Sequence, residues 1–82
     1  MSGWTSSRTN NQEGFEDYYS TQYFGLHVAI RDYQTHYGAR RIVCNVSRDG
    51  ELLAVEVHKT VQEAAEAGLT LAQWIISDPE AV

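Results

Sequence analysis

The chain has little of what disulfide cross-linking or membrane insertion would need. Cys44 is the only cysteine among 82 residues, so no intramolecular disulfide can form, which is typical of proteins from reducing compartments. No apolar run approaches the roughly 20 residues that a membrane span requires. The first residues, 1–14, also lack the apolar core of a signal peptide. We therefore expect a cytoplasmic protein that does not contact a membrane.

The chain also lacks the motifs of known catalytic sites. It contains no glycine-rich phosphate-binding loop, no Walker motif, no nucleophile elbow and no zinc-protease motif. Its three histidines, His27, His36 and His58, show no metal-ligand spacing with one another or with Cys44. Cys44 lies in an apolar pattern, where a thiol behaves as a small hydrophobic side chain. We expect no enzyme activity, no catalytic residues, no metal and no cofactor.

Basic residues are absent after Lys59. The formal net charge of −5 divides into −2 over residues 1–17, +1 over 18–59 and −4 over 60–82, with histidine counted as neutral. The last segment carries Glu63, Glu66, Asp78 and Glu80, which the phosphates of a nucleic acid would repel. Glu63 and Glu66 are therefore candidate contacts for a protein partner with a basic surface, and nucleic acid is a poor candidate for the partner.

The first half of the chain allows two interpretations. Residues 1–14 are polar and predict a flexible tail before a single domain over 15–82, with Trp4 as a candidate anchor for a partner. Over residues 15–37, Tyr and aliphatic side chains recur at spacings of 4, 3, 4, 3 and 4, which predicts an amphipathic helix that ends at Gly38. The members of this stripe are Tyr19, Tyr23, Leu26, Ile30, Tyr33 and Tyr37.

A shorter alternation competes with this helix. Residues 22–31 place Phe24, Leu26, Val28 and Ile30 at every second position, which is typical of a strand. We favour the helix because its stripe extends further and ends on a glycine. Tyr19 and Tyr23 are candidate interface residues, since tyrosine combines a large contact area with a hydroxyl group for the wet edge of an interface.

The clearest feature is a β-hairpin over residues 40–59. Two runs rich in β-formers flank Asp49-Gly50, the typical pair of a type I′ turn, and this turn requires a positive φ at Gly50. A two-residue loop sets Arg48 opposite Glu51. The predicted register then buries three facing pairs on one side, Val46 with Leu53, Cys44 with Val55 and Ile42 with Val57.

Residues 60–77 predict a C-terminal helix. Thr60-Val61-Gln62-Glu63 is a capping box, and Thr70-Leu71-Ala72-Gln73 is a second one after Gly68. The segment is therefore either one helix or two short helices that meet at Gly68. The run Gly68-Leu69-Thr70-Leu71-Ala72-Gln73-Trp74-Ile75 resembles the inter-helix turn and second helix of ribbon-helix-helix regulators, and the preceding residues resemble a helix-turn-helix turn. This resemblance would imply a dimeric DNA-binding regulator or antitoxin.

Together these elements predict an α+β fold of the order helix, strand, strand, helix (αββα), with βββα as the alternative if residues 22–31 form a strand. The leading functional hypothesis is a small acidic protein that binds another protein, as an inhibitor, adaptor or accessory subunit. Its size, acidity and lack of catalytic motifs are similar to those of phage-encoded inhibitors such as anti-CRISPR proteins. A homodimer is one alternative, because a chain this short buries only a modest core.

Overall fold

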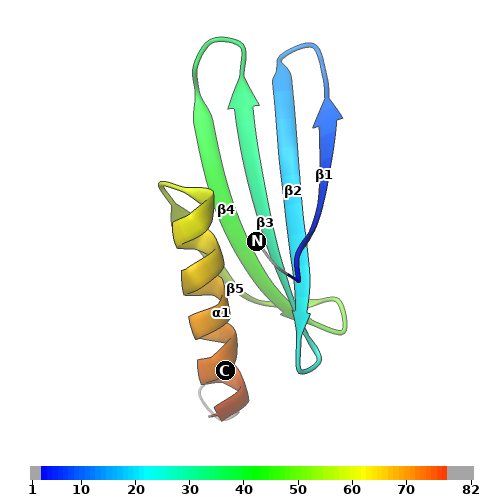
Figure 1. Cartoon of the computed structure of the whole chain (residues 1–82), viewed down its shortest axis with the longest axis vertical. Helices are drawn as coiled ribbons and strands as arrows, with labels where there is room; N and C mark the ends of the chain where they lie inside the picture. The colour runs from blue at the N-terminus through cyan, green and yellow to red at the C-terminus, as the bar shows by residue number, and fades with distance from the viewer. Residues whose placement is uncertain (1–2, 78–82) are drawn as a thin grey trace.

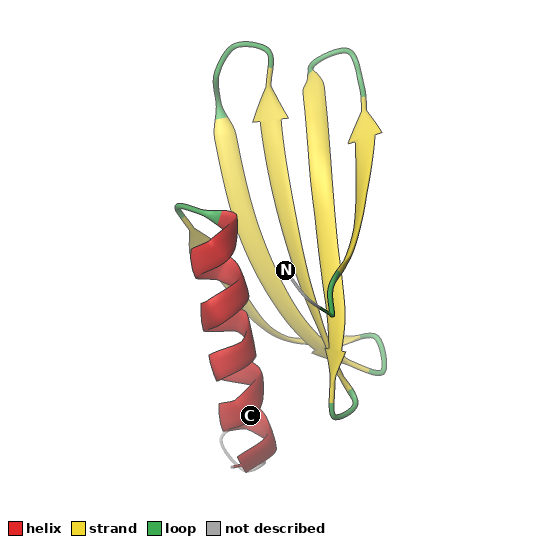
Figure 2. Ribbon diagram, in the orientation of Figure 1, coloured by secondary structure: helices red, strands yellow, loops and turns green. Residues whose placement is uncertain are grey.

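The computed structural model describes residues 3–77 and shows an antiparallel sheet of five strands followed by one helix (Figure 1). The sheet is covered on one side by the helix, which packs on β3, β4 and β5, and its other side is open (Figure 2). The chain is thus a small α+β fold built from β-hairpins. The elements are β1 (Thr5–Asn10), β2 (Gly14–Tyr23), β3 (Leu26–Thr35), β4 (Arg40–Arg48), β5 (Glu51–His58) and α1 (Val61–Ser77).

The predicted αββα fold is wrong, because residues 15–37 form strands instead of a helix. Tyr19 and Tyr23 lie on β2, opposite Ile30 and Leu26 of β3, and all four side chains face the core. A spacing of four keeps side chains on one side of a strand as well as on one side of a helix. The βββα alternative comes closer, since the alternation from Leu26 to Ile30 is part of β3, but it lacks β1 and β2.

The β2–β3 hairpin closes with a two-residue turn, Phe24-Gly25, that lacks the residue pair typical of such turns. Phe24 and Gly25 have φ angles of 46° and 85°, which are the two positive values of a type I′ turn. Asp49 and Gly50 at the β4–β5 turn have φ angles of 50° and 81°, so the predicted positive φ at Gly50 is confirmed. Phe24 is an unusual residue for such a turn, because bulky side chains rarely adopt positive φ.

The β4–β5 hairpin is present, but its register differs from the prediction. Arg48 pairs with Glu51, and a β-bulge then shifts the strands so that Val46 pairs with Ala54. The shift turns Val55 and Val57 to the open side of the sheet, where they are 52% and 62% exposed. Ile42, Cys44 and Val46 are buried as predicted, Leu53 is half-buried, and the partners of the buried three are His58, Glu56 and Ala54.

The N-terminal segment takes part in the sheet. The sequence predicts a flexible tail over residues 1–14, whereas Thr5–Asn10 pair with β2 as strand β1. Arg8 donates from Nε to Oδ1 of Asp17 at 2.6 Å across this pair, and its guanidinium lies 4.3 Å from the centre of the Phe15 ring. Trp4 is half-buried and packs against the core. Backbone pairing and these cross-strand contacts hold a strand that carries no aliphatic side chain.

The core forms between one face of β3–β4 and the inner side of α1. Gly68 lies at the centre of this contact, because α1 approaches β4 so closely there that a side chain would meet Cys44 and Val28. The glycine therefore serves close packing within one continuous helix. The buried apolar side chains of the core are Leu26, Val28, Ile30, Ile42, Cys44, Val46, Ala64, Ala65, Ala72 and Ile75.

The first predicted cap is present and the second is not used. Thr60 Oγ1 accepts a hydrogen bond of 3.0 Å from the backbone N–H of Glu63, as an N-cap residue does. Thr70 Oγ1 instead donates to the carbonyl oxygen of Glu66 at 2.9 Å, a bond made inside a helix. The segment that resembles a ribbon-helix-helix turn therefore lies within α1, and no turn between helices occurs there.

Candidate interaction surface

A shallow groove runs along α1 beside β5. Its apolar members are Ala67, Leu71 and Trp74, and its polar members are Thr70 and the three carboxylates of Glu56, Glu63 and Glu66, which form its negative rim. Spacings of three and four place the helical members on one flank of α1. Trp74 is 51% exposed, which is a large apolar surface to leave in contact with water.

Glu56 reaches this groove because of the β-bulge. In the predicted register its side chain would point to the open side of the sheet, whereas the shifted register places it opposite buried Cys44, on the side of α1. Glu56 thus adds a third carboxylate to the two that the sequence had indicated. Glu63 and Glu66 are neighbours on α1, and Glu56 lies with them in the groove. A regular alternation along β5 would have placed Glu56 on the other side of the sheet.

His58 connects two of these acids. Its Nδ1 lies 3.2 Å from Oε1 of Glu63, and its Nε2 lies 3.4 Å from Oε1 of Glu56. The side chain of His58 is only 12% exposed, while those of Glu56 and Glu63 are 44% and 55% exposed. A half-buried ring with a carboxylate at each nitrogen holds the two acids side by side. No Lys or Arg lies on α1, so the groove has a strongly negative rim.

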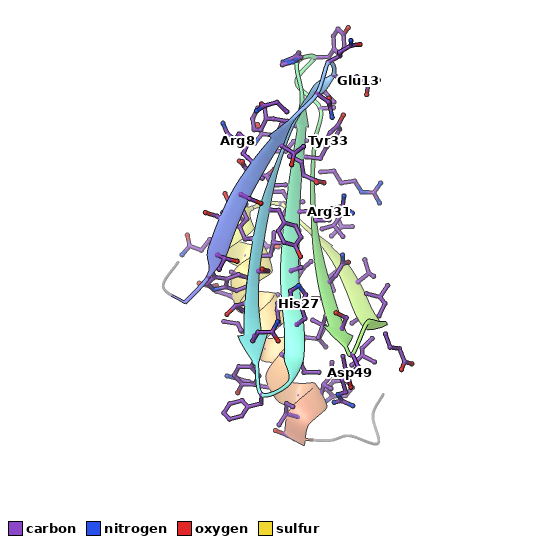
Figure 3. The ribbon with its side chains drawn as sticks, turned by 90° about the vertical axis from the view of Figure 1, so that its right-hand side faces the viewer. Arg8, Glu13, His27, Arg31, Tyr33 and Asp49 are labelled. Carbon is purple, nitrogen blue, oxygen red and sulfur yellow. The ribbon has the colours of Figure 1, made fainter. Side chains whose placement is uncertain are left out.

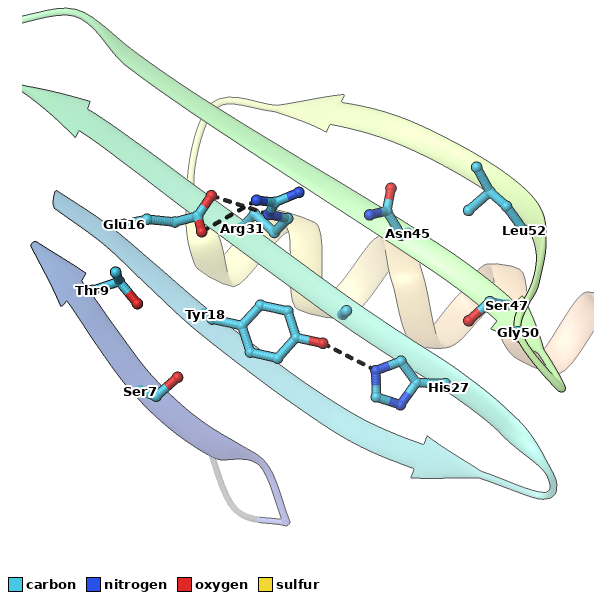
Figure 4. A pocket seen from close by; sticks show the side chains of 11 residues that line it. Ser7, Thr9, Glu16, Tyr18, His27, Arg31, Asn45, Ser47, Gly50 and Leu52 are labelled. Carbon is cyan, nitrogen blue, oxygen red and sulfur yellow. Dashed lines mark hydrogen bonds and ion pairs between the residues drawn. The ribbon is translucent and has the colours of Figure 1, made fainter. Parts of the chain in front are cut away.

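The opposite side of the sheet is a second surface, with its polar groups largely paired. Figure 3 shows His27, Arg31 and Tyr33 along β3, with α1 behind the sheet. In the shallow hollow of about 550 Å³ drawn in Figure 4, Arg31 donates from Nε to Glu16 at 3.0 Å, and the Tyr18 hydroxyl lies 3.1 Å from Nε2 of His27. These internal pairs leave this surface with less uncompensated charge than the groove.

The aromatic candidates lie away from the groove. Trp4, Tyr19 and Tyr23 are half-buried and pack against the core cluster, on the part of the sheet near β2. Tyr23 also meets Phe24 edge to face, with 4.8 Å between ring centres. The structure thus separates the five predicted contact residues into an acidic pair on α1 and an aromatic set that contributes to packing.

The single thiol is unsuited to nucleophilic chemistry. Cys44 is 2% exposed, and burial raises the pKa of its thiol to about 11, with a smaller contribution from the charge of Glu56. A thiol with this pKa is protonated at neutral pH, and the protonated form is a poor nucleophile. Within residues 3–77, no group of three or more His, Cys, Asp or Glu side chains is arranged to hold a metal ion.

Sequence reasoning missed Trp74 as a surface residue and the role of β5. Trp74 belongs to the motif that resembles ribbon-helix-helix regulators. Helical spacing places it one turn beyond Thr70 and on the flank of Glu63, and this spacing was the signal that could have identified it as a surface residue.

In the part of the chain that the structure describes, no helix has both the length and the apolar character needed to cross a bilayer. Comparisons of the chain with protein-family models, with curated proteins and with solved structures give no match to any of them.

Proposed function

We propose that this chain is a small binding protein without catalytic activity, whose groove between α1 and β5 docks a protein with a basic surface. The observation that carries the proposal is that Glu56, Glu63 and Glu66 line the same groove as the exposed Trp74. The binding role would make the chain an inhibitor, an adaptor or an accessory subunit, acting in the cytoplasm.

Apart from the contacts of Glu56 and Glu63 with His58, the acids contribute little to folding. Like charges on one helix repel each other mildly, and only Glu63 lies in the first turn, where the helix dipole favours an acid. Opposite a basic surface, the same acids would speed association through long-range attraction and would align the partner in one orientation.

Trp74 supplies the other part of a binding site. Tryptophan is enriched among the residues that carry most of the binding free energy, which sit near the centre of an interface and are shielded from water by their neighbours. Here the indole lines the groove together with the small side chain of Ala67 and the half-buried Leu71, and Glu63 and Glu66 line the same groove nearer the start of α1. A partner that covers the groove would bury the indole and place its cations against the rim.

The test compares two variants that remove the same amount of charge. Glu63→Gln with Glu66→Gln removes two of the three negative charges of the rim and leaves Glu56. Glu13→Gln with Asp49→Asn removes two acids at opposite ends of the sheet (Figure 3), neither of which lines the groove. Gln keeps the size of Glu at the helix cap, and Asn accepts the positive φ of Asp49. Wild type and both variants are used to capture proteins from extracts of the source cell, and captured proteins are purified for binding measurements.

We expect one or more basic proteins to be retained by wild type and by the control variant, and to be lost with the rim variant. With the purified partner, affinity should fall at least about tenfold in the rim variant and depend less steeply on salt. A partner that binds the rim variant as tightly as wild type would overturn the groove as the docking site.

A further inference from the structure

The two outer strands of the sheet differ in what they present to another chain. β1 consists of Thr, Ser, Arg and Asn and is exposed along its whole length, as is usual for an edge that must not attract a partner. β5, at the other edge, carries Leu52, Val55 and Val57, which are 52–62% exposed. Within residues 3–77, no main-chain hydrogen bond reaches β5 apart from those of its ladder with β4.

Apolar surface flanks this edge on both sides of the sheet. The exposed aliphatic side chains of β5 lie on the open side, and Leu71 and Trp74 of α1 lie on the covered side, beside the same strand. A strand added to β5 would point successive side chains alternately to these two sides. Each side of the added strand would therefore meet an apolar neighbour, and on the α1 side it would also meet the three carboxylates.

We infer that β5 binds an extended segment of the partner as an additional antiparallel or parallel strand, with apolar side chains on the open side and Lys or Arg side chains on the α1 side. The inference rests on the proposed function and specifies the chemistry and conformation of the segment that binds. In this mode, main-chain hydrogen bonds supply affinity, and the alternating side chains supply specificity.

The negative charges of the groove favour a basic segment of a partner over a second copy of this chain. Two copies joined edge to edge through β5 about a two-fold axis would place both α1 helices on the same side of the joint sheet. Glu56, Glu63 and Glu66 of each copy would then face their counterparts, and α1 has no cation to compensate them. A basic segment neutralises the same groups and meets the same apolar floor.

The test uses two synthetic peptides of the length of β5 and the full chain. In the first peptide Val and Lys alternate, and in the second the same residues are arranged as a Val block followed by a Lys block, so that both carry equal charge. Affinity is measured by fluorescence anisotropy, and amide hydrogen exchange is followed by NMR. We expect the alternating peptide to bind at least about tenfold more tightly than the block peptide.

Binding of the alternating peptide should slow exchange at every second amide of β5 and leave the amides of β1 unchanged, because only the outward-facing N–H groups gain a partner. Equal affinity for both peptides, lost together in Glu63→Gln with Glu66→Gln, would overturn strand addition while leaving the acidic docking site intact. Absence of binding by the alternating peptide would also overturn it. So would a dimer in sedimentation experiments whose β5 amides are already protected, since a second copy would then occupy the edge.

Discussion

A Cβ atom at Gly68 would lie 2.7 Å from Sγ of Cys44, closer than two such atoms can pack. The helix and β4 therefore meet at the one position on α1 where the sequence has no side chain. A glycine within a helix costs about 1 kcal/mol relative to alanine. At Gly68 this cost accompanies the close approach of α1 to the sheet, which buries Ala64, Ala65, Ala72 and Ile75.

Gly68→Ala should lower the free energy of unfolding by about 1–2 kcal/mol, because overpacking outweighs the gain in helix propensity. In a Cys44→Ala background the sulfur is gone and only Val28 Cγ1, at 3.0 Å, remains close. The cost of Gly68→Ala should therefore be smaller there, by about 1 kcal/mol. Urea denaturation of the four proteins of this cycle measures the difference. The same cost in both backgrounds would contradict the contact.

Phe24→Asn should stabilise the protein by about 0.5 kcal/mol, because Asn tolerates the positive φ that Phe adopts here. The gain is reduced by the loss of the edge-to-face contact with Tyr23. Phe24→Leu is the control, since it removes the ring and keeps the strain, and it should give no gain. Thermal denaturation of both variants checks the prediction, and a less stable Phe24→Asn protein would show that the aromatic contact dominates.

Trp4→Ala should lower the melting temperature by several degrees, because Trp4 packs against the core and a loss of 1 kcal/mol shifts the melting temperature of a domain of this size by about 4–8 °C. Trp4→Phe, which keeps an aromatic ring at this position, should lose less. An unchanged melting temperature in Trp4→Ala would indicate that the indole contributes nothing to packing and would return it to the candidates for partner binding.

The Arg8–Asp17 pair should make stability depend on pH. The hydrogen bond from Arg8 lowers the pKa of the Asp17 carboxyl, more than burial raises it. A carboxyl with a lowered pKa in the folded state stabilises the fold above its unfolded pKa of about 4, and this contribution is lost as pH falls through the folded value. Arg8→Gln should therefore be less stable than wild type at pH 7, and the difference should narrow as pH falls through the lowered pKa of Asp17, to what the contact of Arg8 with Phe15 contributes. Urea midpoints that stay parallel down to pH 2 would contradict this.

The sequence predicted the second half of the fold better than the first half. Asp49-Gly50 and Thr60 are local signals whose physics acts within a few residues, and the structure confirms both the turn and the cap. The stripe from Tyr19 to Ile30 led to the wrong prediction of a helix, because a spacing of four keeps side chains on one side of both a helix and a strand. The turn at Phe24 gave no warning, because it carries a residue that such turns rarely use. β1 has no hydrophobic pattern at all, so only its pairing with β2 identifies it as a strand.

In the candidate site, too, local spacing was predictable from the sequence and the irregular pairing of strands was not. Glu63 and Glu66 share a helix, and their proximity follows from helical spacing alone. Glu56 joins them only because a bulge shifts β5 by one residue, and regular alternation cannot reveal a bulge. The exposure of Val55 and Val57, on which the strand-addition proposal depends, comes from the same shift.

The order of the elements along the chain bears on how the protein folds during synthesis. Each strand pairs with the one before it, so every hairpin can form as soon as its second strand leaves the ribosome, at a low cost in loop-closure entropy. The helix that covers the sheet comes after all five strands. Leu26, Val28 and Ile30 thus remain open to solvent until α1 emerges, and the nascent sheet has no second layer to pack against. Completion of the helix is therefore the step that converts a set of hairpins into a stable fold.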